Sequence, residues 1–310
     1  MIVRQRPALF QLFFIWRGSI VPHVLPEIVF VASFAALITW AAQHYGNLFP
    51  DYSAAPFALL GLAFSIFLGF RNNACYDRWW EARKQWGSLI VELRSLARET
   101  LVLEGDGDGD GAGNALRRQV VRRGLAFAHA LAARLRGRDA LAEAAPFLPA
   151  GEAESLAGSR NLPDALLLRQ GRDLAEALRA GHLSDILYQG LSQRLLALSG
   201  VQAACERIRH TPLPFAYTLL LHRTAHLFCL LLPFGLARSV GWATPLLTAV
   251  LAYTFFGLDA LGDELEEPFG TLENDLPLDA LVRVLEVDLG EALGETELPP
   301  ALEPQGYILL

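Results

Sequence analysis

The chain alternates between long stretches without Asp, Glu, Lys or Arg and a densely charged middle block. The uncharged stretches cover residues 28–50, 52–70 and 239–258, and a fourth, 210–237, contains only Arg223. A helix of about 20 apolar residues spans the hydrocarbon core of a bilayer. The pattern therefore predicts four transmembrane helices, at residues 27–45, 54–71, 215–237 and 241–258. The alternative is that some of them are buried helices of a soluble core.

The second uncharged stretch continues directly into a charged, tryptophan-rich segment. Residues 64–87 read FSIFLGFRNNACYDRWWEARKQWG, with neither Gly nor Pro between Gly69 and Gly87. Gly and Pro are the residues that most often interrupt a helix. We therefore expect one continuous helix that leaves the membrane and extends into water.

The charged block, residues 71–209, is too long for a loop and has the periodicity of amphipathic helices. One helix is expected to begin at Asn161, two residues before Pro163, and to stop at Gly181; another follows and ends before Pro212. The sequence has no strand signature and no internal repeat. The predicted fold class is an all-α membrane protein with a cytosolic helical bundle. Its expected segments, from the interfacial N-terminus to the acidic C-terminus, are 1–26, 27–71, 72–213, 214–258 and 259–310.

Composition and the placement of basic residues support a membrane protein. Of all residues 53% are hydrophobic and 19% are charged, and the mean hydropathy of +0.30 is unusual for a soluble protein. Basic residues resist translocation and stay in the cytosol. They flank the first two predicted helices on their outer ends, and the connection between these helices has neither Lys nor Arg, so both termini should be cytosolic. The flanking residues are Arg4, Arg6, Arg17, Arg71, Arg78, Arg83 and Lys84.

The opening segment lacks the layout of a cleaved signal peptide. Arg17 interrupts its apolar run, and no small-residue cleavage site follows. Residues 8–16, ALFQLFFIW, instead predict an interfacial segment with Trp16 and the phenylalanines at headgroup depth.

The second predicted membrane helix carries two parallel rows of side chains. Residues four apart share a helix face, so Leu62, Ile66 and Phe70 form a bulky apolar row. A neighbouring row contains only small residues, which allow another helix to approach closely; these are Gly61, Ser65 and Gly69. In a monomer the bulky row would meet lipid. In an oligomer around an axis it would form apolar rings that close a pore by dewetting.

Residues 104–114, EGDGDGDGAGN, resemble the first half of a calcium-binding loop. Asp106, Asp108 and Asp110 match the ligand spacing, but Arg117 occupies the twelfth position, where a bidentate Glu belongs. Because alternating Gly and Asp are costly to order, a flexible loop between helices is the better interpretation.

Two histidines four residues apart, His222 and His226, lie on the third predicted membrane helix with Arg223 beside them. Their spacing would suit two metal ligands, but ionisable groups within a membrane usually face the protein interior or a wet cavity. An interhelical packing cluster is therefore favoured, and we expect no metal site.

No motif indicates an enzyme. The sequence has no Ser/His/Asp arrangement, no phosphate-cradling glycine loop and no HExxH motif, so we expect neither catalytic residues nor a cofactor. Cys75, Cys205 and Cys229 match no zinc spacing and are not expected to form disulfides.

Two segments resemble signatures of the bestrophin family. FLGFRNNACYDRWWEARKQWG, residues 67–87, is similar to the signature that leaves the second transmembrane helix, and PFGTLENDLPLD, residues 268–279, is similar to its counterpart after the fourth. The order of helices also matches, and the likeness is closest to the bacterial branch. It implies a homopentameric ion channel with a central pore, a membrane neck and a cytosolic vestibule. It further implies a multi-pass protein of the bacterial inner membrane whose partners are lipid and small ions, not nucleic acid.

The resemblance assigns roles to individual residues. It places the three neck rings on Leu62, Ile66 and Phe70 and the cytosolic aperture on Ile186. The first ring is often Ile in the family, so Leu62 departs from the pattern and would alter the closed radius. By sequence pattern alone, Ile186 is an ordinary residue of a bundle core.

The signature below the second helix is interpreted as a structural coupling between the neck and the bundle. Its tryptophans, Trp79, Trp80 and Trp86, should lie just below the bilayer, and its charges can pair across subunits. The residues assigned to packing or to this signature are Gly61, Ser65, Gly69, Arg71, Asn72, Asn73, Asp77, Arg78, Trp79 and Glu81.

The C-terminal part bears on calcium and on the choice of ion. Eukaryotic bestrophins carry there a consecutive acidic run that helps to form a calcium clasp; here it is broken to Glu273, Asn274 and Asp275, so calcium gating is not expected. From Asp259 to Glu297 there are 13 acidic residues and one Arg, a net charge of −12. If some of these carboxylates line a vestibule, they would concentrate cations near the pore.

Several functions therefore remain open. Eukaryotic members of the family are chiefly anion channels and bacterial relatives can favour cations, while apolar rings do not choose a sign. The acidic tail slightly favours monovalent cations, with chloride as the competing assignment. A non-conducting, membrane-anchored sensor or scaffold is the alternative from another class, and an enzyme comes third.

Overall fold

The computed structural model describes residues 1–4, 7–12, 14–46, 53, 55–104 and 111–310 of the chain. Within these ranges the chain is helical and contains no strand longer than an isolated bridge. It forms two compact units, which we name the apolar unit (residues 4–79 and 212–268) and the bundle unit (residues 1–3, 80–211 and 269–310). The all-helical fold class is thereby confirmed.

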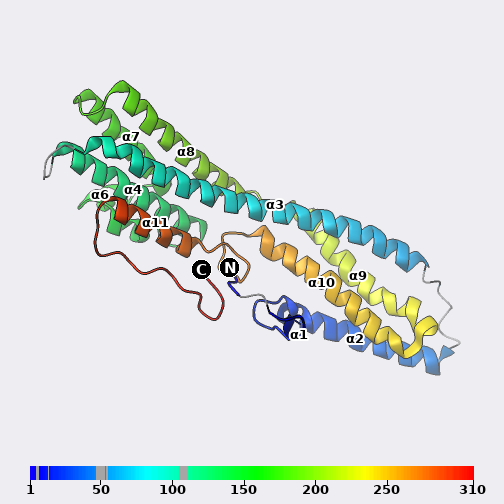
Figure 1. Ribbon diagram of the computed structural model, residues 1–310. Helices are drawn as coiled ribbons and strands as arrows, with labels where there is room; N and C mark the ends of the chain where they lie inside the picture. The colour runs from blue at the N-terminus through cyan, green and yellow to red at the C-terminus, as the bar shows by residue number, and fades with distance from the viewer. Residues whose placement is uncertain (5–6, 13, 47–52, 54, 105–110) are drawn as a thin grey trace. The chain divides into compact units, whose positions relative to one another are not determined.

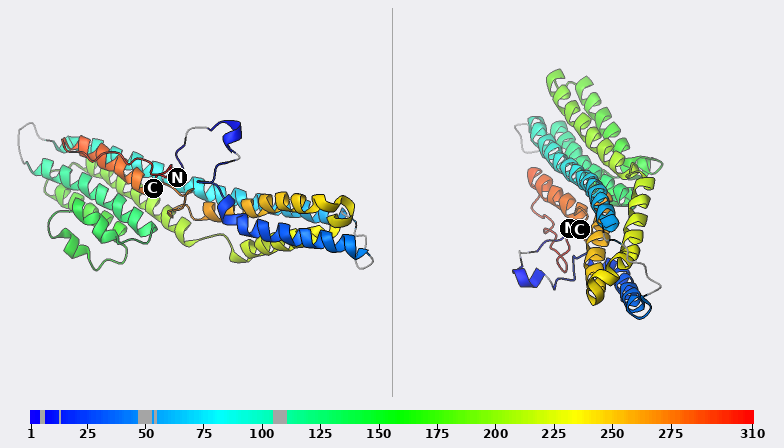
Figure 2. Two further views of the ribbon diagram at one scale, coloured as in Figure 1. Left: turned by 90° about the horizontal axis from the view of Figure 1, so that it is seen from below. Right: turned by 90° about the vertical axis from the view of Figure 1, so that its right-hand side faces the viewer.

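The apolar unit contains the four helices that the uncharged stretches predicted and two short ones, α1 and η4. They are α1 (Leu9–Leu12), α2 (Val21–His44), the first part of α3 (Ala55–Glu99), α9 (Phe215–Val240), the short η4 (Gly241–Ala243) and α10 (Thr244–Glu266). Helices α2, α9 and α10 pack against one another (Figure 2). Phe64 of α3 joins their core, with its ring 5.0 Å from Phe255 of α10, and Phe228 of α9 lies 5.4 Å from the same ring.

Three stretches of the described chain are long and apolar enough to cross a membrane. They are Val21–His44, Ala55–Leu103 and Phe215–Glu266, and the third includes both α9 and α10. Unlike in a water-soluble domain, large apolar side chains cover the outside of these helices; Leu59, Leu220 and Leu246 are each more than 60% exposed. Such a surface requires lipid or another chain as its neighbour.

Helix α3 is one uninterrupted helix of 45 residues, which confirms the predicted continuous helix (Figure 1). The prediction was less accurate for α10, which was expected to end at residue 258 but extends to Glu266. The additional residues, DALGDELE, are mostly good helix formers, so the helix continues after the uncharged stretch has ended.

The bundle unit contains the second part of α3 and the remaining helices. They are η2 (Thr100–Leu103), α4 (Ala112–Leu135), α5 (Ala140–Ala144), η3 (Ala145–Phe147), α6 (Glu152–Leu156), α7 (Leu162–Arg179), α8 (Asp185–His210) and α11 (Leu278–Ala292). Helix α4 is central, because it contacts α5, α7, α8 and α11 and buries residues such as Phe127 and Leu131 completely. The two helices predicted on either side of Gly181 are confirmed as α7 and α8.

Asn161 occupies the N-cap position of α7, as predicted, but its side chain does not cap the helix. The second helical residue is Pro163, which has no N–H to donate to a capping oxygen. The Asn161 amide instead donates to Glu206 (3.0 Å) and accepts from Gln202 (3.1 Å), and thereby connects α7 to α8.

The two ends of the chain pair with each other inside the bundle unit. The Met1 ammonium group donates to the Leu309 carbonyl (2.6 Å), and the Val3 amide donates to the Tyr307 carbonyl (2.8 Å). Gly306 and Tyr307 both have positive φ and form a tight turn that returns the chain toward residue 2. Burial lowers the pKa of the Met1 amine, and the nearby Asp275 carboxylate partly offsets this effect.

Candidate functional site

The exposed face of α3 carries the bulky row found in the sequence. Leu62, Ile66 and Phe70 are 61%, 50% and 61% exposed. On the opposite face, Phe64 and Leu68 are at most 3% exposed and pack into the core of the apolar unit. The bulky row therefore points away from the chain's own core, toward whatever surrounds the helix.

Within one chain, only one member of the row of small residues allows another helix to approach closely. At Gly61 a Cβ atom would lie 3.0 Å from the Phe228 ring, so this glycine allows α9 to approach. Ser65 is exposed and donates to the Gly61 carbonyl (2.7 Å), and a Cβ at Gly69 would meet nothing within 4 Å. The predicted packing role of Ser65 and Gly69 thus requires a neighbour from another chain.

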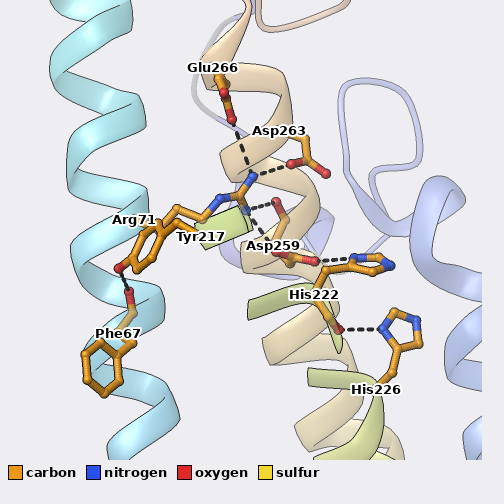
Figure 3. Close-up of polar contacts among 8 residues, drawn as sticks. All are labelled: Phe67, Arg71, Tyr217, His222, His226, Asp259, Asp263 and Glu266. Atoms are coloured by element: carbon orange, nitrogen blue, oxygen red, sulfur yellow. Dashed lines mark hydrogen bonds and ion pairs between the residues drawn. The ribbon is translucent and has the colours of Figure 1, made fainter. Parts of the chain in front are cut away.

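One residue after Phe70, the chain buries a positive charge. Arg71 is fully buried, and its Nη1 donates to the backbone carbonyl (3.1 Å) and the carboxylate (2.8 Å) of Asp259. Its Nη2 is paired with Asp263 and lies 3.7 Å from the Glu266 carboxylate. We call Arg71, Asp259, Asp263, Glu266 and His222 the Arg71 cluster; Figure 3 shows its side chains converging from α3, α9 and α10.

The α9 side of the Arg71 cluster contains the two histidines. His222 Nδ1 lies 2.9 Å from the Asp259 carboxylate, and His226 Nδ1 lies 2.9 Å from the His222 carbonyl. The His226 ring packs on Phe256 of α10, with 4.6 Å between centroids. The histidines therefore join α9 to α10, and no group of three or more potential ligands for a metal ion occurs among the described residues.

The sequence did not predict the partners of Arg71, because the fourth membrane helix was expected within residues 241–258 and the following carboxylates were counted with the acidic C-terminal part. A signal was present: Asp259, Asp263 and Glu266 are spaced by four and three residues, so they share one face of a continued helix. Three carboxylates on one face at the end of an apolar helix indicate that a basic partner lies nearby.

The remaining signature residues behave differently from one another. Arg78 Nε donates to the Glu266 carbonyl (2.6 Å), and Glu81 pairs with Lys84 (2.9 Å). Asn73 and Asp77 are exposed, and Asn72 and Trp79 are partly buried. Trp86 is fully buried in the core of the bundle unit, whereas Trp80 is 47% exposed. That the tryptophans lie just below the bilayer stays a prediction.

Ile186 is the second residue of α8 and is 82% exposed. It is therefore not part of the core of the bundle unit, the role that the sequence pattern alone suggested. It lies in a different unit from the bulky row of α3.

The structure describes two of the residues that bear on calcium binding, Arg117 and Asp275. Asp106, Asp108 and Asp110 lie outside the described residues, while Arg117 is buried, pairs with Glu104 (2.8 Å) and donates to the Ala292 carbonyl (2.6 Å). In the broken acidic run Asp275 is 1% exposed and accepts from the Leu272 amide (2.6 Å), so its carboxylate is engaged in its own turn.

Comparison with known proteins identifies the family. The family model described as "Bacterial/Fungal Bestrophin protein" matches residues 1–291. This chain is a bestrophin of the bacterial and fungal family. The voltage-dependent anion channel-forming protein of Mesorhizobium japonicum is 50% identical over 304 residues, 98% of this chain and 95% of the relative. The protein YneE of Escherichia coli K12, which carries the same descriptive name, is 40% identical over 310 residues and 100% of both chains.

Solved structures agree with the family assignment. The crystal structure of a bacterial bestrophin homologue from Klebsiella pneumoniae matches with a TM-score of 0.83 and 36% sequence identity, over 88% of this chain and 100% of that chain. A point variant of the same homologue matches with a TM-score of 0.82. Together with the apolar helices of this chain, the family makes it a membrane protein.

Proposed function

We propose that this bestrophin forms a homopentameric ion channel in the bacterial cytoplasmic membrane. Helices α2, α3, α9 and α10 cross the membrane, and both termini lie in the cytosol. The observation that carries the proposal is the bulky row: Leu62, Ile66 and Phe70 are exposed on a helix whose opposite face is buried, in a chain of this family. Around a shared axis these side chains form three stacked apolar rings, the neck of the pore.

The neck acts as a gate because water leaves a narrow apolar constriction and ions cannot cross it without their hydration shell. Ile186, which is exposed at the start of α8, forms a second apolar ring at the cytosolic aperture. The small residues Ser65 and Gly69 border the bulky row and let the α3 helices of adjacent subunits approach one another.

The permeant ions are small and monovalent, and the proposal assigns anions. This choice rests on the descriptive names of the relatives, which are voltage-dependent anion channel-forming proteins. A second candidate, a cation channel, is favoured by one observation on this chain, the net charge of −12 between Asp259 and Glu297. Acidic side chains beside a pore attract cations and repel anions.

Two recordings on the purified protein in planar bilayers test the proposal. Under asymmetric NaCl, an anion channel has a reversal potential near the chloride equilibrium potential, and a cation channel near that of sodium. A silent bilayer containing assembled protein would favour the non-conducting scaffold.

The second recording uses the triple variant Leu62→Ala, Ile66→Ala, Phe70→Ala. Truncation widens and wets the neck, so conductance rises while the pentamer, followed by the mass of the detergent-solubilised particle, remains intact. Unchanged currents from a correctly assembled triple variant would remove the neck assignment.

A further inference from the structure

We infer that Arg71 is the positioning residue of the neck: it fixes the rotation of α3 about its own axis and thereby directs Phe70 toward the pore. This inference rests on the proposed channel function, since it explains how the third ring of the neck is held.

Arg71 and Phe70 are neighbours on α3, so their directions around the helix axis are linked. Successive residues of an α-helix are separated by about 100° around the axis. Phe70 is 61% exposed, and Arg71, its neighbour, is fully buried. Any rotation of α3 that moved Arg71 out of its site would turn Phe70 by the same angle, so holding one side chain holds the other.

Arg71 is held by several contacts to α10. Its guanidinium group contacts three successive acidic side chains on one face of α10, with Asp259 bound through both its carbonyl and its carboxylate. A guanidinium is planar and presents its donors in a fixed fork, so contacts on two of its nitrogens define its direction. A second bond, from the Tyr217 hydroxyl of α9 to the Phe67 carbonyl (3.0 Å), holds α3 one turn earlier (Figure 3).

The close packing of α10 around Arg71 also constrains the arginine, independently of charge. A Cβ atom at Gly262 of α10 would lie 2.9 Å from Arg71 Nη1 and 2.7 Å from the Asn72 side-chain oxygen. Contacts this short do not occur, so a side chain at this position would push against both Arg71 and Asn72. Helix α10 therefore carries a glycine at the point where the arginine crosses it.

Two features of the Arg71 cluster allow the position of the guanidinium to change. Asp263 is 58% exposed and His222, which shares Asp259 with Arg71, is 54% exposed, so one edge of the Arg71 cluster is open. The buried Nε of Arg71 has no hydrogen-bond partner among the described residues. Within the described part of the chain the guanidinium is thus held through its two terminal nitrogens, so a displacement of Asp263 or Asp259 is transmitted to α3 through these contacts.

The test uses two substitutions that keep the charge balance. Arg71→Lys keeps the positive charge but replaces the fork by a single ammonium group. Gly262→Ala keeps every charged group but places a methyl group against Arg71 and Asn72. Each has a matched control. Arg94→Lys changes another arginine of α3, which pairs with Asp288 and is 47% exposed; Gly257→Ala changes another glycine of α10, whose Cβ would lie an ordinary 3.6 Å from Ile20.

The main readout is the position of residue 70 itself. In a Phe70→Cys background we measure the rate of modification by a charged methanethiosulfonate reagent; the three native cysteines are buried and give little background. Arg71→Lys and Gly262→Ala are expected to change this rate about tenfold, as a shift in the population of helix rotations would. The two controls leave it unchanged, and particle mass shows that assembly persists.

Equal modification rates in the Arg71→Lys and Gly262→Ala variants and in their parent would overturn the inference. That outcome is distinct from failure of the channel proposal, because labelling requires no current. If the neck triple variant alters conductance while these two variants alter neither labelling nor conductance, the channel stands and the role of Arg71 falls. If assembled protein never conducts but the labelling rates shift, Arg71 positions α3 in a protein that is not a channel.

Discussion

Each unit of the chain contains a completely buried arginine, and the surroundings of the two differ. In the bundle unit Arg123 of α4 binds both carboxylate oxygens of Glu152 at 2.8 Å and Asp173 at 2.7 Å. All three of its nitrogens have partners, and Glu152 and Asp173 are only 6% and 16% exposed. In the apolar unit the Nε of Arg71 has no partner among the described residues, and the contacts of Arg71 extend to the half-exposed Asp263.

The difference indicates that the Arg123 contacts stabilise the bundle unit, whereas the Arg71 contacts orient α3. A buried charge that is fully hydrogen-bonded has one favourable arrangement, and removing one member leaves the others uncompensated. The Arg123 contacts therefore hold α4, α6 and α7 together. The Arg71 cluster has an open edge and a donor without a partner among the described residues. When Arg71 is replaced, water can therefore solvate part of the carboxylates that remain. The main effect of replacing Arg71 is then expected on the orientation of α3.

The largest expected effect is on the Arg123 contacts. Arg123→Met leaves the carboxylates of Glu152 and Asp173 buried without their cation and should lower the free energy of unfolding by about 3–5 kcal/mol. Hydrogen exchange in α4, α6 and α7 should accelerate accordingly, whereas Arg94→Met, which removes an exposed pair with Asp288, should not have this effect. Unchanged exchange in α4 would show that these contacts do not lock the bundle.

A smaller loss of stability is expected for the same change at the other arginine. Arg71→Met should cost about 2 kcal/mol, because Asp263 is already solvated and Asp259 keeps its contact with His222. Denaturant unfolding followed by circular dichroism measures both variants under the same conditions. A loss equal to that of Arg123→Met would erase the distinction between the two clusters.

The third prediction probes the bundle unit through pH. Burial raises the pKa of the Cys205 thiol to about 12, while the thiol of the unfolded chain ionises near its usual value of about 8.5. The folded state therefore retains a proton that the unfolded state loses, and the stability present below about pH 8.5 is lost as pH rises toward 12. Between pH 8 and 10 the bundle unit should lose about 2 kcal/mol, and Cys205→Ala should remove this dependence. Rapid reaction of Cys205 with a thiol reagent at pH 8 without denaturant would contradict its burial.

The smallest change in stability is expected for a substitution at the open edge of the Arg71 cluster, where His222 lies. His222→Gln retains a hydrogen-bond donor to Asp259, and because the His222 side chain is 54% exposed, stability should change by less than about 0.5 kcal/mol. Asp259→Asn provides the contrast, since it removes a buried carboxylate directly from Arg71. A large loss with His222→Gln would mean that the edge is closed by something outside this chain.

Much of the fold could be predicted from the sequence because one physical signal dominates it. Uncharged stretches of membrane length located α2, the start of α3, α9 and α10, and the absence of helix breakers after Gly69 predicted the continuity of α3. Asn161 and Gly181 correctly marked the ends of α7. The bulky row on α3 followed from periodicity, and its exposure in the structure agrees with a face that has no partner within the described part of the chain.

The rest could not be predicted because it depends on contacts between distant segments. A charge count assigns Asp259 and Asp263 to the acidic C-terminal part, and only the contacts between α10 and α3 reveal that both pair with a buried arginine. The same limit applies to Trp86, which the local sequence places with its neighbours Trp79 and Trp80 and the fold places in a core. The bulky row depends on contacts between chains, since its exposed side chains on one chain could face either lipid or the axis of an oligomer.

A cryo-electron microscopy reconstruction of the assembled protein tests the central claim most directly. The account predicts a fivefold-symmetric particle in which Leu62, Ile66 and Phe70 face the symmetry axis as three successive constrictions. A particle of any symmetry in which these three side chains face the surrounding lipid or detergent would contradict it.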